Sequence, residues 1–120
     1  IRVSDVNNLE KSYNLFCHVN TEKDIQKAVS YYNIVKLQSR DARQLGAASL
    51  EFGFVAAGRV ESIMIPGANA YDVAAGVLLV REAGGKVTDF VGKDWNLGSK
   101  DILATNGKIH NQLLEIINNS

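Results

Sequence analysis

The sequence predicts an α/β fold, a layered sheet covered by buried helices. Short segments rich in Val, Ile and Leu alternate along the chain with helical patterns, which is typical of α/β layers. Two longer segments are apolar almost all round, which predicts helices packed against a sheet. Because the 120 residues contain no linker long enough to divide them, we expect a single domain over residues 1–120.

The first third of the chain predicts a strand, a helix and a second strand. The aromatic and apolar run at 13–19 has the length of a strand. Thr21 stands where an N-cap belongs, and apolar residues follow it at helical spacing, so we expect a helix to about Asn33. The run at 34–38 then predicts a strand.

The middle of the chain predicts the two buried helices. The first covers 45–57 and the second covers 71–83, and each is followed by glycine, the residue that favours a helix C-terminus. Between them, 60–65 predicts a strand and 66–69 the turn that ends it. Both helices should lie in the core.

The last third predicts two short strands and an amphipathic helix. The strands are expected at 86–91 and 102–105, separated by a loop rich in Gly, Asp and Asn. The helix is expected from about residue 107 to 118, with its apolar residues on one face.

Composition excludes several classes of protein. Thirteen Lys and Arg balance thirteen Asp and Glu, so no net charge attracts nucleic acid or an anionic membrane. No apolar run approaches the roughly 20 residues that cross a bilayer. The single cysteine, Cys17, has no zinc-ligand spacing around it, and we expect a soluble, cytoplasmic protein in which it packs as a small apolar residue.

Asp72 stands at the start of the second buried helix. The unpaired amides of a first helical turn stabilise an anion, and a positioned carboxylate is a ligand that Mg²⁺ prefers. Asp is also a favoured N-cap residue, so the position alone fits a plain cap better than a metal ligand. His18, His110 and Glu82 lack any catalytic pattern around them, and we expect packing or surface roles for them.

The segment 71–85 resembles the second signature of the inositol monophosphatase family, Trp-Asp-x-Ala-x-Gly followed by Glu-Ala-Gly-Gly. Similar segments lie on both sides of it, at 43–50, 55–60, 87–89 and 102–106. The resemblance covers about residues 38–118. It implies the C-terminal half of the sugar phosphatase fold.

This resemblance implies an Mg²⁺-dependent phosphatase acting on inositol monophosphate or fructose-1,6-bisphosphate, in which the ions activate a water molecule and stabilise the phosphate. Asp72 would be a metal ligand and would also contact a substrate hydroxyl. The backbone of Gly46, Ala47 and Ala48 would lie near the sugar or inositol ring, and Arg43 would hold the acidic cluster in place. We expect the intact protein to be a homodimer acting on small phosphate esters.

Two residues depart from the family pattern. Tyr71 replaces the usual Trp and keeps a large aromatic side chain. Ile65 stands where inositol-selective members tend to have a glutamate that binds ring hydroxyls. Loss of that polar contact should relax selectivity toward other phosphates, including fructose bisphosphate.

The family's first signature, Asp-Pro-x-Asp-Gly-Thr, does not occur in the sequence, whose one proline, Pro66, is followed by Gly67. The chain also begins at Ile1 without a methionine. We therefore expect a fragment that is completed by an N-terminal half and is inactive by itself, because one carboxylate cannot hold two Mg²⁺ ions. The alternative is a non-catalytic α/β module for binding or assembly.

Overall fold

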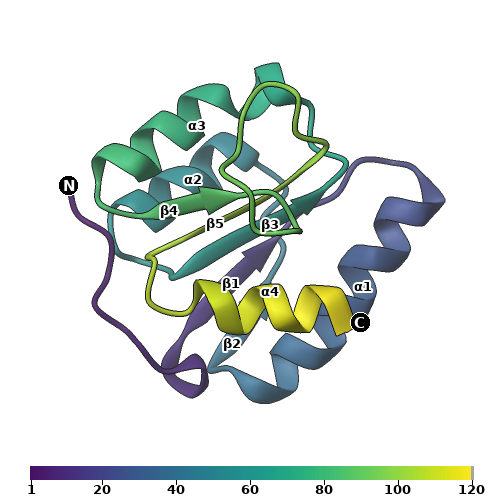
Figure 1. Ribbon diagram of the computed structural model, residues 1–120. Helices are drawn as coiled ribbons and strands as arrows, with labels where there is room; N and C mark the ends of the chain where they lie inside the picture. The colour runs from purple at the N-terminus through teal and green to yellow at the C-terminus, as the bar shows by residue number, and fades with distance from the viewer. Residues whose placement is uncertain (120) are drawn as a thin grey trace.

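The structure, a computed structural model, describes residues 1–119 as a five-stranded sheet with helices on both faces (Figure 1). The strands are β1 (Tyr13–Phe16), β2 (Asp41–Arg43), β3 (Ser62–Pro66), β4 (Lys86–Thr88) and β5 (Asp101–Thr105). The helices are α1 (Glu22–Gln38), α2 (Ala48–Ala56), α3 (Ala70–Glu82) and α4 (His110–Asn119), preceded by the 3₁₀ turn η1 (Leu9–Lys11). The predicted α/β class is confirmed.

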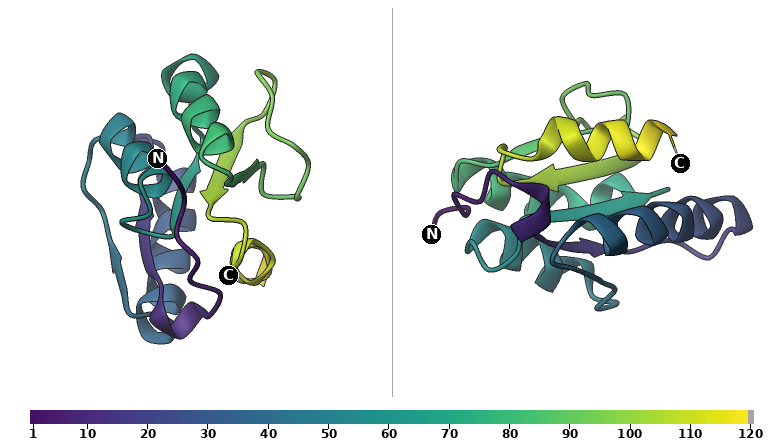
Figure 2. Two further views of the ribbon diagram at one scale, coloured as in Figure 1. Left: turned by 90° about the vertical axis from the view of Figure 1, so that its left-hand side faces the viewer. Right: turned by 90° about the horizontal axis from the view of Figure 1, so that it is seen from below.

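The sheet has the strand order β2-β1-β3-β5-β4. β1 pairs in parallel with both β2 and β3, whereas β5 is antiparallel to β3 and to β4. Parallel neighbours need crossover connections, and α1 and α2 supply them. Helices α1 and α4 cover one face of the sheet, and α2 and α3 cover the other (Figure 2).

The core follows the alternation of side chains along the central strands. Leu15 and Ile63 pack on the side of α2 and α3, while their neighbours Phe16 and Met64 pack on the side of α1 and α4. No helix among residues 1–119 is both long and apolar enough to span a bilayer.

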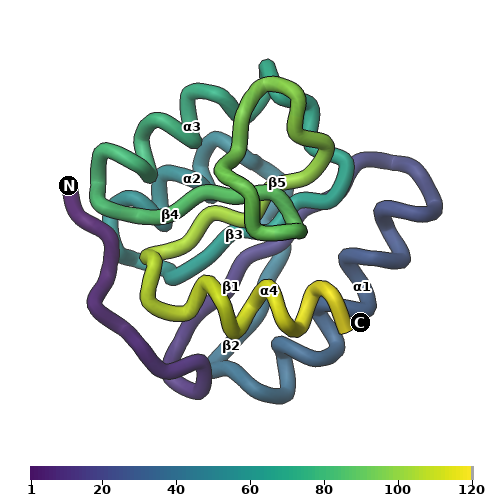
Figure 3. The backbone as a smooth tube through the Cα atoms, viewed as in Figure 1, coloured from purple at the N-terminus to yellow at the C-terminus, as the bar shows by residue number. Residues whose placement is uncertain are grey.

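The N-terminal segment before β1 closes the edge of the sheet at which the parallel strands begin. The tube in Figure 3 shows it running from the end of α3 toward η1. The Val3 amide donates to the Ala83 carbonyl at 3.1 Å, and Asn106 Nδ2 donates to the carbonyls of Ser4 and Val6 at 3.2 and 2.7 Å. These bonds tie the segment to both α3 and β5.

Helix α1 is longer than the sequence predicts. Thr21 is its N-cap as expected, because the hydroxyl accepts from the Asp24 amide at 3.4 Å. The predicted strand at 34–38 is wrong, since the helix continues to Gln38. Val35 is fully buried and extends the helical face begun by Ala28 and Tyr31, so helical periodicity outweighs the strand preference of this short apolar run.

Helices α2 and α3 are buried only in part, which corrects the prediction of burial on all sides. Each packs on the sheet and on the other helix, and an added Cβ at Gly76 would lie 2.5 Å from Phe52 Cγ. Their outer faces leave Leu50 51%, Leu78 59% and Tyr71 82% exposed. Within residues 1–119, nothing covers these side chains.

Candidate active site at the carboxyl edge of the parallel strands

The parallel strands β1, β2 and β3 end at one edge of the sheet, which we call the carboxyl edge. The loops 17–21, 44–47 and 67–69 leave from it. After β1 the chain enters α1 on one face, and after β3 it enters α3 on the other, although β1 and β3 are neighbours. Such a divergence opens the crevice in which α/β proteins commonly bind ligands.

Asp72 lies at this edge in the first turn of α3, and its side chain is exposed. Asn69 caps the helix, its Oδ1 accepting from the Tyr71 amide at 3.0 Å, so the plain-cap interpretation of Asp72 is wrong. Among residues 1–119, no group forms a hydrogen bond with the Asp72 carboxylate. The charge is stabilised by the helix N-terminus and stays available to a ligand.

The loop predicted to face a substrate ring reaches the same edge. Helices α2 and α3 both run antiparallel to β3, so both begin where the parallel strands end. Gly46 and Ala47 are exposed, and Ala48 opens α2. The topology therefore places this loop and Asp72 at one edge of the sheet.

Arg43 ends β2 and pairs with an acid in its own strand. Its Nε donates to Asp41 Oδ2 at 2.6 Å, and Lys36 pairs with the same carboxylate. Hydrogen bonds from Lys36 and Arg43 lower the pKa of Asp41 to about 2. The observed ion-pair partner of Arg43 is thus Asp41.

Glu51 is the site residue that the sequence analysis missed. It lies near the start of α2 and is fully buried, with Oε2 accepting from the Leu45 amide at 3.3 Å. Oε1 is buried without a hydrogen-bond partner among the described residues. Burial raises the pKa of this carboxyl group, against hydrogen bonds from the amides of Leu45 and Ala47. The available signal was a single acid inside an apolar helix.

Cys17 follows β1 at the carboxyl edge and is half-buried. Burial and the nearby charge of Glu51 raise the pKa of its thiol. A thiol held in its protonated form is a poor nucleophile, which agrees with the packing role expected of this residue.

Ile65 lies at the carboxyl end of β3, where the family resemblance suggests a ring-binding glutamate. The side chain is 4% exposed and belongs to the core beneath α2 and α3. It therefore offers a substrate no polar group.

Among residues 1–119, no three His, Cys, Asp or Glu side chains are grouped so that they could hold a metal ion. His110 is buried between the hydroxyls of Thr88 and Thr105, each at 2.8 Å, and burial lowers its pKa to about 4. This is the packing role expected of it. Asp72 therefore belongs to no such group in the part of the chain that the structure describes.

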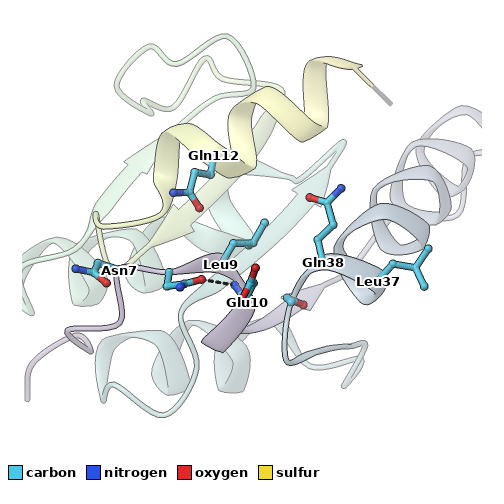
Figure 4. A pocket seen from close by; sticks show the side chains of 8 residues that line it. Asn7, Leu9, Glu10, Leu37, Gln38 and Gln112 are labelled. Carbon is cyan, nitrogen blue, oxygen red and sulfur yellow. Dashed lines mark hydrogen bonds between the residues drawn. The ribbon is translucent and has the colours of Figure 1, made fainter.

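A hollow of about 890 Å³ lies at the opposite end of the sheet (Figure 4). It is bounded by η1, the end of α1 and α4, and Asn7, Gln38 and Gln112 project around it. Glu10 is the only charged residue among the described residues that line it. With no cation to neutralise a phosphate, this hollow is a weaker candidate than the carboxyl edge.

The sequence profile described as "Inositol monophosphatase family" matches residues 1–120. The chain belongs to the inositol monophosphatase family. The match extends beyond residues 38–118, which carry the sequence resemblance, to the segment that forms β1 and α1.

Relatives in this family carry more than one kind of name. The chain is 36% identical over 118 residues to "Fructose-1,6-bisphosphatase/inositol-1-monophosphatase" of Thermotoga maritima, covering 98% of this chain and 44% of that protein. It is 44% identical over 92 residues to "Nus factor SuhB" of Escherichia coli, covering 74% of this chain and 34% of that protein.

A solved IMPase structure from Thermotoga maritima superposes with a TM-score of 0.89 at 35% identity, covering 99% of this chain and 45% of that one. The predicted sugar phosphatase fold is confirmed. The chain spans less than half the length of these relatives.

Proposed function

We propose that the intact protein is a cytoplasmic Mg²⁺-dependent phosphomonoesterase that hydrolyses inositol monophosphate or fructose-1,6-bisphosphate. Residues 1–120 are its C-terminal half, a single domain that is inactive by itself. Family membership supports the phosphatase class. The observation that carries the proposal is Asp72, an exposed carboxylate at a helix N-terminus with no hydrogen-bond partner among residues 1–119.

In this proposal Asp72 is a metal ligand and contacts a substrate hydroxyl. Bound Mg²⁺ supplies the activation of water and the stabilisation of phosphate charge. The exposed backbone from Gly46 to Ala48 meets the sugar or inositol ring, and Arg43 supports this site through its ion pair with Asp41. A carboxylate fits a hard cation, but octahedral Mg²⁺ needs further ligands from outside this chain.

The outer face of α2 and α3 supports contact with the rest of the intact protein. Leu50, Leu78 and Tyr71 are exposed there, and apolar surface of this kind is favourable to bury. We further propose that the intact protein is a homodimer. Light scattering across a concentration series checks this, and a monomer at all concentrations contradicts it.

Asp72→Asn in the intact protein tests the proposal. The substitution keeps the shape of the side chain and removes the charge that binds the cation, so Mg²⁺-dependent turnover should fall by about 100-fold or more. The control is Glu82→Gln, which removes an exposed acid at the other end of α3. Equal activity of the wild type and Asp72→Asn would contradict the role of Asp72.

Substrate preference is a separate part of the proposal. Because Ile65 offers no polar group, hydrolysis of fructose-1,6-bisphosphate should be comparable with that of inositol monophosphate. Measurement of kcat/KM for both substrates checks this. A strong preference for inositol monophosphate contradicts it.

The second candidate is a non-catalytic α/β module that binds a ligand or serves assembly. It is supported by the absence, among residues 1–119, of a group of three acidic, His or Cys side chains that could hold a metal ion, and by the name of the Escherichia coli relative, a Nus factor. Absence of Mg²⁺-dependent turnover in the intact protein would favour this candidate. Turnover by the purified 120-residue chain would contradict the proposal that it is inactive alone.

A further inference from the structure

Glu51 is a costly residue for the place it occupies. Glu51 is 0% exposed, on a helix whose residues Phe52 and Val55 belong to the hydrophobic core. A buried carboxylate loses its hydration, and one oxygen of Glu51 finds no partner among residues 1–119. An apolar side chain of similar size would fill this space more favourably, so stability alone does not explain an acid here.

The contacts of Glu51 explain the acid. The carboxylate accepts a hydrogen bond from the Leu45 amide at 3.3 Å, and the Ala47 amide on the other side of Gly46 lies close enough to lower the pKa of Glu51 against the effect of burial. Ala47 is the N-cap of α2 and has no side chain that could cap the helix. Glu51 does not cap the free amides of the first turn. It instead anchors, from within α2, the backbone that leads into the helix.

The loop has little else to fix its conformation. Gly46 has φ +80°, a left-handed conformation that glycine adopts without strain, and an added Cβ would meet nothing within 4 Å. Packing around Gly46 thus contributes little to the shape of the loop. The buried hydrogen bond to Glu51 holds the loop at its Leu45 amide.

We infer that Glu51 is a positioning residue for the loop 45–48, whose backbone it holds in the conformation that meets the substrate ring. This inference rests on the proposed function for the identity of the ligand. The part of the inference that concerns the order of the loop is independent of the proposed function, because the contacts of Glu51 determine that order directly. Glu51 itself touches no substrate.

The test uses three variants of the intact protein. Glu51→Met fills the same space without an acceptor, and Glu51→Gln keeps a side-chain oxygen for the Leu45 amide. Glu61→Met is the matched control, because Glu61 is 3% exposed and its Oε1 also accepts from a backbone amide, that of Tyr13 at 2.6 Å, at the opposite edge of the sheet.

Hydrogen exchange of the amides at 45–48 and the kinetics with fructose-1,6-bisphosphate are the two measurements. Loss of a hydrogen bond to a charged group should make exchange about tenfold faster in Glu51→Met and raise KM by a similar factor, with kcat nearly unchanged. Glu51→Gln should restore most of both effects. Glu61→Met should change neither, even where it lowers stability.

Unchanged exchange in Glu51→Met would overturn the inference, as would equal acceleration in Glu61→Met, which indicates general loosening of the fold. Faster exchange with unchanged KM would also overturn it, because the loop would then not contact substrate. If the wild type hydrolyses no phosphate ester, the proposed function fails, and the exchange data alone still decide whether Glu51 orders the loop.

Discussion

The two edges of the sheet use their polar side chains differently. Where the parallel strands begin, Asn14 Nδ2 donates to Ser12 Oγ at 2.8 Å, and its Oδ1 accepts from Ser62 Oγ at 2.6 Å. At the carboxyl edge, Asp72 has no hydrogen-bond partner among residues 1–119, and Glu51 leaves one oxygen unpaired. The difference indicates that Asn14 at the first edge stabilises the fold, whereas Asp72 is left for a ligand and Glu51 orders a loop, at a cost in stability.

The largest expected effect concerns His110. Burial, reinforced by the charge of Lys86, lowers its pKa to about 4, whereas the unfolded chain binds this proton near pH 6.5. The unfolded state therefore takes up the proton first as the pH falls, and stability should decrease between about pH 6.5 and 4, by up to about 3 kcal/mol.

Urea unfolding at pH 7 and pH 4 measures this loss. The variant His110→Gln keeps hydrogen-bonding groups toward Thr88 and Thr105 but does not titrate, so it should lose less stability over the same interval. Parallel losses in the two proteins would show that other groups cause the acid sensitivity.

Asn14→Ala should have the next largest effect, about 2 kcal/mol of lost stability, because it leaves the buried hydroxyls of Ser12 and Ser62 without their shared partner. Chemical denaturation gives the stability, and KM of the intact protein should stay unchanged. A change in KM would break the division of roles between the two edges.

Glu51→Gln should act in the opposite direction. Burial in the folded state raises the pKa of Glu51. Above that pKa the carboxyl group is ionised and lowers the stability of the fold, whereas below it the group is protonated and this loss disappears. The variant should gain about 1 kcal/mol at neutral pH, and this gain should shrink as the pH falls toward the ordinary value of a carboxyl group. Thermal unfolding at several pH values checks the sign.

The smallest effect is expected for Tyr31→Phe. The Tyr31 hydroxyl is fully buried, and it forms no hydrogen bond of good geometry with any described residue. Burial raises its pKa, and the nearby Ser62 hydroxyl lowers it by a smaller amount. Its removal should change stability by less than about 1 kcal/mol, toward a gain. A loss of more than that would reveal a hydrogen bond to Ser62.

Much of the fold could be predicted because its central elements follow simple periods. Short runs rich in Val, Ile and Leu placed β3 and β5 within a few residues, and apolar segments that end at glycine placed α2 and α3. The run at 34–38 was assigned to a strand because a short apolar segment fits the periodicity of a strand as well as that of a helix. Only the position of Val35 on the buried face of α1 decides for the helix.

The candidate site was predicted less completely. Asp72 was placed at a helix start, but the sequence did not identify Asn69 as the cap, since several residues in that turn can accept the same hydrogen bond. Glu51 was missed because its role depends on burial and on an amide six residues earlier, which spacing does not show. The pairing of Arg43 with Asp41 likewise depends on the end of β2.

The close contact of Gly76 with Phe52 has a consequence for ligand affinity. Because Gly76 has no side chain, the Phe52 side chain packs directly against the backbone of α3, which brings the two helices, and with them the two helix starts, close together. A molecule that bridges both helix starts then loses less entropy on binding, because the protein groups it meets are already ordered. Tight binding would require only a few contacts.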